Sequence, residues 1–428
     1  MKQVVLFLLA GLAVALSGCA APSSSGVTPT PIRSSALPQL AVTATPVPQP
    51  TQSAQLAATL TAQLAPTATV GPSGMGTIGI SGVNTLFLGK GPDGRSLYAA
   101  HTVGLRNFLT NQTHFVAIYA QSDGGFQEVS RLVLPDTDYL GDNSVTQQQI
   151  DPKLIWLQVE GGAGANSGCF DLLSFDGRTL TDQAHQCNAN PNRSRIENLY
   201  GSGTPEVVLD QSDNLIFCHA CGVTKFKFRV LRWDGSSMVE QKITSLPSPA
   251  PADLQRLTNR AVDLAGAGLW KDAQTTITQA KALNPQDPTV IMDAGLIGLY
   301  AGAFGQQAQD GPYPLLDNVF YGDYPAALNV MRPLSPAQIF SQQSPLVVGT
   351  VAQGFEQSLE QQLITSTTQA LQVEPNLAAA YFIRGWALYL ANPSDPKVLS
   401  DVQKAAQLDP KEPLYSQSLQ YLKARGGS

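Results

Sequence analysis

The spacing of apolar residues changes once along the chain, near residue 250, and this change restricts the fold more than any other feature. Residues 75–246 contain short runs rich in β-branched and aromatic residues, such as Phe115–Tyr119 and Phe226–Trp233. In residues 251–428 the apolar residues recur at helical spacing instead. The pattern predicts a multidomain protein in which an all-β domain precedes an all-α domain.

Asp-Gly pairs punctuate the predicted β domain at Asp93, Asp123, Asp176 and Asp234. Asp-Gly favours the left-handed backbone of a tight hairpin. The last two pairs close similar units, each with a strand, a polar loop that contains cysteine, and a strand that ends at Asp-Gly. This internal similarity predicts a few blade-like meanders. A β-sandwich is the alternative, because about 170 residues are few for a seven-bladed propeller.

The N-terminus has the features of an export signal. Lys2 is positive, and residues 4–16 form an uncharged run that is too short to span a bilayer. The run ends in Leu16, Ser17, Gly18 and Cys19, which resembles the lipobox of bacterial lipoproteins. The resemblance implies a signal peptide over residues 1–18, lipid on the Cys19 thiol, and display on the outer face of a bacterial membrane. An ordinary secretory signal with a chance cysteine is the alternative.

Residues 19–74 are rich in Pro, Thr, Ser, Ala and Gln, with Arg33 as their only charge. Such a segment buries too little apolar surface to offset the entropy of ordering, so it is predicted to be a disordered tether from the lipid. Residues 52–64 have some helical character but no evident partner, and they are assigned to the tether as well.

The helical part resembles tetratricopeptide repeats. One repeat covers residues 254–288, and a later copy begins near Tyr381. The first copy has small residues where its two helices would meet (Ala261, Ala273 and Ala280), a glycine in the turn between them (Gly268) and a proline after the second helix (Pro285). The later copy has the small residues Gly385 and Ala405 and the closing proline Pro410. Residues 303–350, rich in Pro, Gly and Gln, interrupt the period as a predicted insertion. A generic helical bundle is the alternative.

The same resemblance implies a curved solenoid that binds an extended peptide on its concave face. Placing the chain on the repeat pattern puts six bulky residues there: Met292, Leu296, Tyr300, Phe382, Trp386 and Tyr389. Trp386 and Tyr389 are the predicted anchors of a protein segment. The alternative is that these side chains pack against the insertion or the β domain, or belong to the core.

Four cysteines remain after Cys19 is assigned to lipid, and an even number in an exported chain predicts disulfides. Closure of short loops favours the pairs Cys169–Cys187 and Cys218–Cys221 over the two other pairings. A redox or zinc motif at Cys218–Cys221 is the alternative, but it lacks a βαβ context and a second pair of ligands.

Residues 198–206 resemble the acidic loops of FG-GAP and VCBS-type propeller repeats, in which alternating oxygen ligands bind calcium. Asn198, Ser202 and Glu206 keep such oxygens, but Tyr200 occupies a ligand position and one carboxylate remains. A solvated turn is therefore predicted, with a calcium site as the alternative and no other cofactor.

Composition and motifs narrow the functional classes. The net charge of −6 provides no basic surface for nucleic acid. The chain has no GxSxG, HExxH or GxGxxG motif. We therefore predict a non-enzymatic, surface-displayed scaffold with a protein or peptide ligand. The alternatives are an extracytoplasmic enzyme or carbohydrate-binding protein that uses the β domain, and a calcium-dependent adhesion module. The cleft between the two folded domains discriminates between them: a deep pocket of converging Asp, Glu or His favours the enzyme, and an aromatic helical groove favours the binder.

Overall fold

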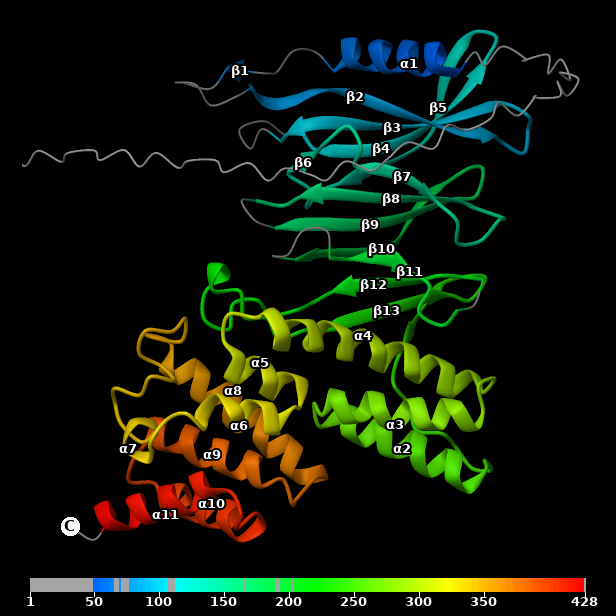
Figure 1. The fold of residues 1–428 in the computed structure, drawn as a ribbon. Helices are drawn as coiled ribbons and strands as arrows, with labels where there is room; N and C mark the ends of the chain where they lie inside the picture. The colour runs from blue at the N-terminus through cyan, green and yellow to red at the C-terminus, as the bar shows by residue number, and fades with distance from the viewer. Residues whose placement is uncertain are drawn as a thin grey trace, which may run out of the picture. The chain divides into compact units, whose positions relative to one another are not determined.

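The computed structural model describes residues 49–64, 69–70, 77–106, 112–164, 167–188, 193–201 and 203–426. The predicted signal peptide, the lipobox with Cys19 and the tether up to residue 48 lie outside the described residues, as does Ser202. Within the described residues a β region is followed by a helical region (Figure 1). The predicted fold class, an all-β domain before an all-α domain, is confirmed.

In the described part of the β domain, twelve strands form three antiparallel meanders of four. The first contains β2 (Thr77–Lys90), β3 (Ser96–Leu105), β4 (His114–Ser122) and β5 (Gly125–Leu134). The second contains β7 (Val145–Gln148), β8 (Ile155–Gly162), β9 (Gly168–Phe175) and β10 (Leu180–Asn188). The third contains β11 (Arg195–Glu197), β12 (Glu206–Asp210), β13 (Phe228–Trp233) and β14 (Met238–Gln241).

Two short strands complete the sheets. β6 (Tyr139–Leu140) pairs with β3 and β8, and thereby joins the first two meanders into one curled sheet. β1 (Thr69–Val70) pairs with β2 at the edge of that sheet. The expected blade-like meanders are therefore present, and the sandwich alternative is not adopted.

The Asp-Gly pairs lie in hairpin turns, as their chemistry predicts. In the turn between β9 and β10, Asp176 Oδ1 accepts hydrogen bonds from the amides of Arg178 and Thr179, at 2.8 and 2.7 Å. The following Gly177 has a φ of 97°, in the left-handed region that favours glycine. Similar bonds to the backbone recur in the turns at Asp93 and Asp234.

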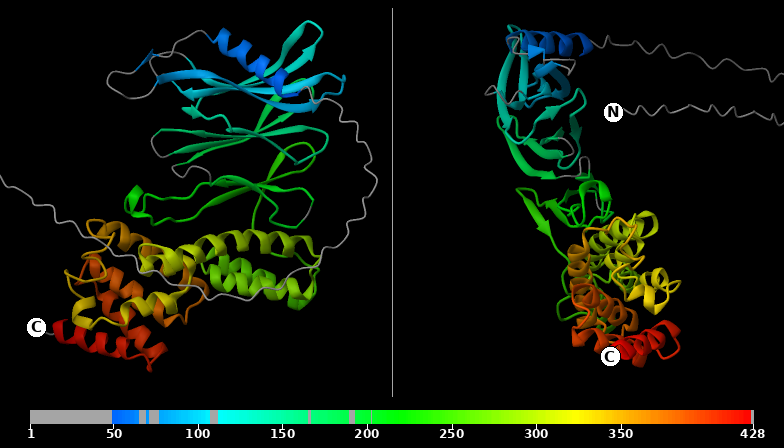
Figure 2. Two further views of the ribbon diagram at one scale, coloured as in Figure 1. Left: turned by 45° about the horizontal axis from the view of Figure 1, so that its top comes forward. Right: turned by 90° about the vertical axis from the view of Figure 1, so that its left-hand side faces the viewer.

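Separate cores lie between successive meanders. On β9, Leu173 and Phe175 belong to the core shared with the first meander. Phe170 and Leu172 belong instead to the core shared with the third meander. This arrangement follows from the strand period of two, which sends alternate side chains to opposite faces. Figure 2 shows the meanders in chain order from two further sides.

Helix α1 (Gln49–Gln63) covers the outer face of the first meander (Figure 1). Leu56 and Leu60 lie one helical turn apart, and they are 1 % and 8 % exposed. They pack against a group that includes Val83, Tyr98 and Phe115. The assignment of residues 52–64 to a disordered tether is therefore wrong. The helix does have a partner, a sheet face assembled from distant residues.

The helical domain contains α2 (Ala252–Gly266), α3 (Trp270–Leu283), α4 (Pro288–Asp310), α5 (Pro314–Tyr321), α6 (Tyr324–Met331), α7 (Pro336–Ile339), α8 (Glu356–Val373), α9 (Ala378–Ala391), α10 (Pro396–Leu408) and α11 (Pro413–Gly426). Residues 303–350, predicted to be an insertion, hold the end of α4 and all of α5, α6 and α7. Their side chains Phe320, Tyr324 and Phe340 are buried in the same core as the other helices. This segment therefore adds helices to the core of the domain.

Helix α4 contributes to two cores. Leu296 and Leu299 pack against Val208 and Val230 of the third meander, whereas Ile297 lies in the helical core. By length and composition α4 is the one helix among the described residues that could cross a membrane. Its packing on both sides, with the buried carboxyl of Asp293, is instead typical of a core helix.

Candidate functional site

A cleft of about 810 Å³ lies where β13 and β14 meet α2, α3 and α4. Four aromatic side chains line it: Phe226 and Phe228 from the strand side, Trp270 at the start of α3, and Tyr300 of α4. Each of the four is partly exposed. The cleft therefore presents accessible aromatic surface of the kind that ligand pockets use for affinity.

The aromatic side chains hold one another in fixed positions. The rings of Trp270 and Tyr300 stack nearly parallel, with centroids 4.4 Å apart and 7° between their planes. Phe228 meets the ring of Tyr300 edge-on at 5.2 Å. The Tyr300 hydroxyl accepts from the Phe228 amide at 3.0 Å and donates to the Phe228 carbonyl at 3.1 Å. One side chain of α4 thus satisfies both backbone groups at the start of β13, and the cleft is organised before any ligand arrives.

Charged side chains of both signs line the cleft beside the aromatic surface. Lys225 Nζ donates to Gln362 Oε1 at 3.1 Å, and burial lowers the pKa of this lysine. Glu240 lies between two cations, 3.3 Å from Arg229 Nε and 3.6 Å from Lys242 Nζ. Lys227 and Asp213 complete the charged lining, and both are exposed. A ligand in this cleft meets hydrogen-bonding groups at its edges and aromatic carbon beneath.

The lining of the cleft holds few kinds of reactive side chain. The described residues around the cleft include no His, Cys or Ser, and the two carboxylates are those of Asp213 and Glu240. Glu240 is already neutralised by its two cationic neighbours. The other ionisable side chains of the lining are those of Lys225, Lys227, Lys242 and Tyr300.

The peptide groove predicted on α9 is not exposed. Phe382 and Trp386 are 0 % exposed, and Tyr389 is 6 % exposed. Trp386 Nε1 donates to the carbonyl of Ile339 at 3.1 Å. Phe340, next in the chain, contacts the rings of both Phe382 and Tyr389. The prediction of exposed anchors is therefore wrong, because α7 and the residue after it occupy that face.

The other half of the predicted groove, on α4, faces the β domain. Leu296 is 3 % exposed, and Met292 packs beside it on the third meander. Leu296 and Tyr300 do line the cleft, so two of its residues are among those predicted for the groove. Sequence reasoning missed Trp270, Phe226 and Phe228. No motif in the sequence marks Trp270 as a binding residue, and the two phenylalanines belong to a strand run without a specific signal.

Disulfides form at both predicted pairs. Cys169 and Cys187 join β9 to β10, and Cys218 and Cys221 close the loop around the short 3₁₀ helix η1 (His219–Cys221). The C-x-x-C segment is therefore a local disulfide in this structure.

The candidate calcium loop uses its carboxylate internally. Glu206 is fully buried, and its Oε2 accepts from the Leu199 amide at 2.9 Å. Its Oε1 lies 3.7 Å from Arg232 Nε, and burial raises its pKa. Asn198 is exposed. Among the residues that the structure describes, no group of three or more His, Cys, Asp or Glu is placed to hold a metal ion.

No family model and no curated protein matches this sequence.

Proposed function

We propose that this protein is a non-enzymatic binding protein and that it captures an extended polypeptide segment in the aromatic cleft. The observation that carries the proposal is the cleft itself, about 810 Å³ in volume, with Phe226, Phe228, Trp270 and Tyr300 in its wall. Partly exposed aromatic side chains that are already held in place lose little entropy on binding, which is why such residues dominate binding energy at interfaces.

Two features favour a polypeptide over a carbohydrate. Trp270 and Tyr300 stack on each other, so each ring covers one face of the other, whereas a sugar binds best on a free aromatic face. The cleft is also lined by Glu240 and Gln241 of β14. Within the described residues β14 pairs with β13 alone, so its second edge offers backbone hydrogen bonds to an extended chain.

We further propose that the protein is exported and anchored through lipid on Cys19. The lipobox-like residues support this, and the two disulfides are typical of an oxidising, extracytoplasmic compartment. Cys19→Ser should move the protein from the membrane fraction to the soluble fraction. A variant that stays with the membrane after a high-salt wash would contradict the anchor.

We assign the helical domain to the tetratricopeptide-like class. Ala261, Ala273 and Ala280 are fully buried, as expected where paired helices approach closely. Gly268 has a φ of 72° in the turn between α2 and α3. In this proposal the helices act as a scaffold that presents Trp270 and Tyr300. We leave calcium out of the proposal, because Glu206 is engaged with the Leu199 amide and Arg232.

The test uses the Cys19→Ser protein, which should be soluble, and a displayed library of random linear peptides. Selected peptides are synthesised with a fluorophore, and their affinity is measured by fluorescence anisotropy. Trp270→Ala should weaken binding by at least about tenfold, the loss typical of an aromatic hot spot. Leu283→Ala is the matched control, because Leu283 lies on the same helix, is 56 % exposed and is not part of the cleft lining.

The control should bind the peptides as the parent protein does. Equal binding by Trp270→Ala, with its melting temperature retained, would place the peptide site elsewhere. A library that yields no binder, together with specific binding on an array of glycans, would instead support the carbohydrate-binding alternative.

A further inference from the structure

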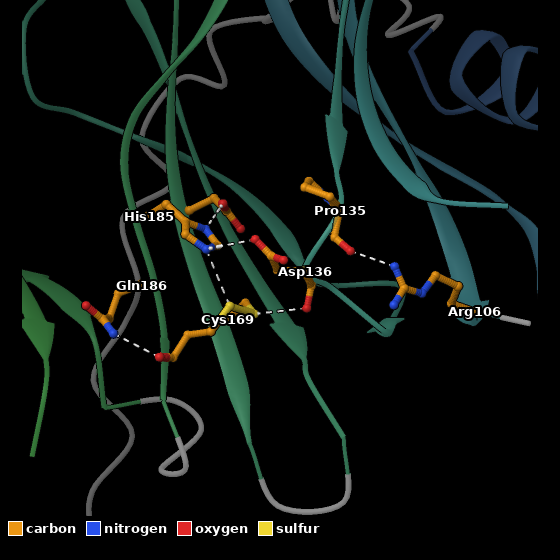
Figure 3. Close-up of polar contacts among 8 residues, drawn as sticks. Arg106, Pro135, Asp136, Cys169, His185 and Gln186 are labelled. Atoms are coloured by element: carbon orange, nitrogen blue, oxygen red, sulfur yellow. Dashed lines mark hydrogen bonds and ion pairs between the residues drawn. A yellow bond between two sulfur atoms is a disulfide. The ribbon is translucent and has the colours of Figure 1, made fainter. Parts of the chain in front are cut away.

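The Cys169–Cys187 disulfide joins two directly opposed residues of β9 and β10, but its two ends differ in exposure. Cys169 is 3 % exposed, and its sulfur lies 3.4 Å from the carbonyl oxygen of Asp136. Cys187 is only half-buried. A thiol that approaches from solvent therefore reaches the Cys187 sulfur first. Figure 3 shows this region.

A histidine stands beside the more accessible sulfur. His185 precedes Cys187 by two residues, so the strand period places both side chains on one face of the sheet. Its Nε2 lies 3.5 Å from Cys187 Sγ, and its Nδ1 lies 2.6 Å from Asp171 Oδ1 (Figure 3). Asp171 is the direct cross-strand neighbour of His185 and is 3 % exposed. The ring is thus held with one nitrogen on a buried carboxylate and the other toward the disulfide.

The charged groups around this ring are carboxylates. Asp171 lies on β9, Asp182 on the same strand as His185, and Asp136 in the connection between β5 and β6, with its Oδ2 3.5 Å from Nε2. The hydrogen bond that His185 donates to the Asp171 carboxylate, together with the charges of all three carboxylates, raises the pKa of His185 against the opposing effect of burial. A positive imidazolium therefore persists to a higher pH here than on an isolated histidine.

We propose that Cys187 is a thiol-exchange site, at which a dithiol opens the Cys169–Cys187 bond with the His185 imidazolium as the neighbouring cation. Thiolates are the attacking and leaving species of disulfide exchange, and an adjacent cation stabilises them. The proposed ligand class is a small or protein-borne dithiol. The site is separate from the aromatic cleft and does not depend on the function proposed for it.

The exchange proceeds in two steps. In the first, one thiolate of the dithiol attacks Cys187 Sγ, the bond to Cys169 breaks, and its electron pair stays on Cys169 Sγ, which takes up a proton. In the second, the remaining thiolate of the dithiol attacks the first dithiol sulfur, which is bonded to Cys187 in the mixed disulfide. This attack expels the Cys187 thiolate beside His185 Nε2–H. The Cys187 thiolate then takes up the second proton from solvent, so that overall the dithiol is oxidised to a disulfide, and two electrons and two protons pass to Cys169 and Cys187.

The experiment measures opening of each disulfide by dithiothreitol across pH 5.5 to 9, by alkylation and mass spectrometry, with every rate divided by the concentration of reagent thiolate. The parent protein should show a rate at Cys169–Cys187 that falls about tenfold as His185 loses its proton. His185→Gln should show no such fall. Asp171→Asn keeps an oxygen acceptor for Nδ1 but removes a charge, so the fall should move to lower pH. Cys218–Cys221 is the reference within the same molecule.

A second measurement identifies the sulfur that is attacked. Reduced glutathione should be trapped as a mixed disulfide on the Cys187 peptide. All variants are first checked by mass spectrometry for both intact disulfides. Glutathione on Cys169, or a pH profile of His185→Gln that superimposes on that of the parent, would overturn the proposal.

Discussion

Replacing Asp293 with asparagine should stabilise the protein at pH 8, and by a smaller amount at pH 5. The Asp293 side chain on α4 is fully buried, and its Oδ1 accepts from the Thr244 amide at 3.0 Å. Its Oδ2 has no hydrogen-bond partner among the described residues. Burial, with a smaller effect of the Asp287 charge, raises the pKa of Asp293 to about 7.

The direction of the effect follows from proton linkage. The ordinary pKa of this carboxyl is 3.8, so the folded state binds the proton more tightly than the unfolded state does. The contribution of Asp293 to stability is therefore most favourable at acidic pH, and it is lost as the pH rises from about 4 to about 7. The difference between 3.8 and about 7 corresponds to at most about 4 kcal/mol at pH 8. Local relaxation around the charge reduces this, so we expect a gain of about 1–3 kcal/mol for Asp293→Asn.

The assay is urea unfolding of the Cys19→Ser protein at pH 5 and pH 8, with and without Asp293→Asn. Asparagine keeps an oxygen acceptor for the Thr244 amide and removes the charge. The effect of the substitution on the free energy of unfolding at pH 8, minus its effect at pH 5, therefore reports the ionisation of Asp293. Asp310→Asn is the matched control, because Asp310 lies at the exposed end of the same helix. A gain of equal size at both pH values, or a loss at pH 8, would refute the reasoning.

Three further substitutions test the packing. Trp386→Ala should lower the free energy of unfolding by about 3–5 kcal/mol, because the fully buried ring is lost together with its hydrogen bond to the Ile339 carbonyl. A change below about 1 kcal/mol in urea unfolding would mean that Trp386 is an exposed groove residue. Leu56→Asp should release α1 and speed amide hydrogen exchange over residues 52–64, whereas unchanged exchange would mean that the contact is not stabilising. Gly385→Leu should cost about 1–3 kcal/mol, because even a Cβ there would lie 3.1 Å from Val402. Gly302→Ala on α4 is the control for Gly385→Leu: a Cβ there meets nothing within 4 Å, and alanine favours a helix interior over glycine, so urea unfolding should show no loss of stability.

Features that depend on local chemistry could be predicted from the sequence. The Asp-Gly hairpins follow from a side chain that bonds to the next few amides and a glycine that accepts positive φ, as at Asp176 and Gly177. The turn at Gly268 between α2 and α3 follows from the same conformational freedom. The disulfide pairs follow from short loops. In each case the residues that decide the outcome are close in the sequence.

Features that depend on distant partners could not be predicted in this way. The apolar residues of α1 are visible in the sequence, but the sheet face that they cover is assembled from three strands beyond them. Trp386 has the spacing of a helical face, yet spacing does not say which neighbour covers that face; here α7 and Phe340 do. The cleft combines Trp270 with Phe228 and Tyr300, which come from separate elements, and their stacking has no signature in the chain.

The order of the meanders has a consequence for how the molecule reaches its folded state. Because successive cores follow the order of the chain, folding can advance as a sequence of nearest-neighbour steps, as in repeat proteins. A chain that crosses a membrane from its N-terminus could close each interface soon after the next meander emerges. The outer face of the third meander is buried last, because Val208 and Val230 are covered by Leu296 and Leu299 of α4, which follow about 60 to 90 residues later in the chain. We therefore expect this face to be the surface most prone to aggregate during folding, and the first to need protection by a chaperone.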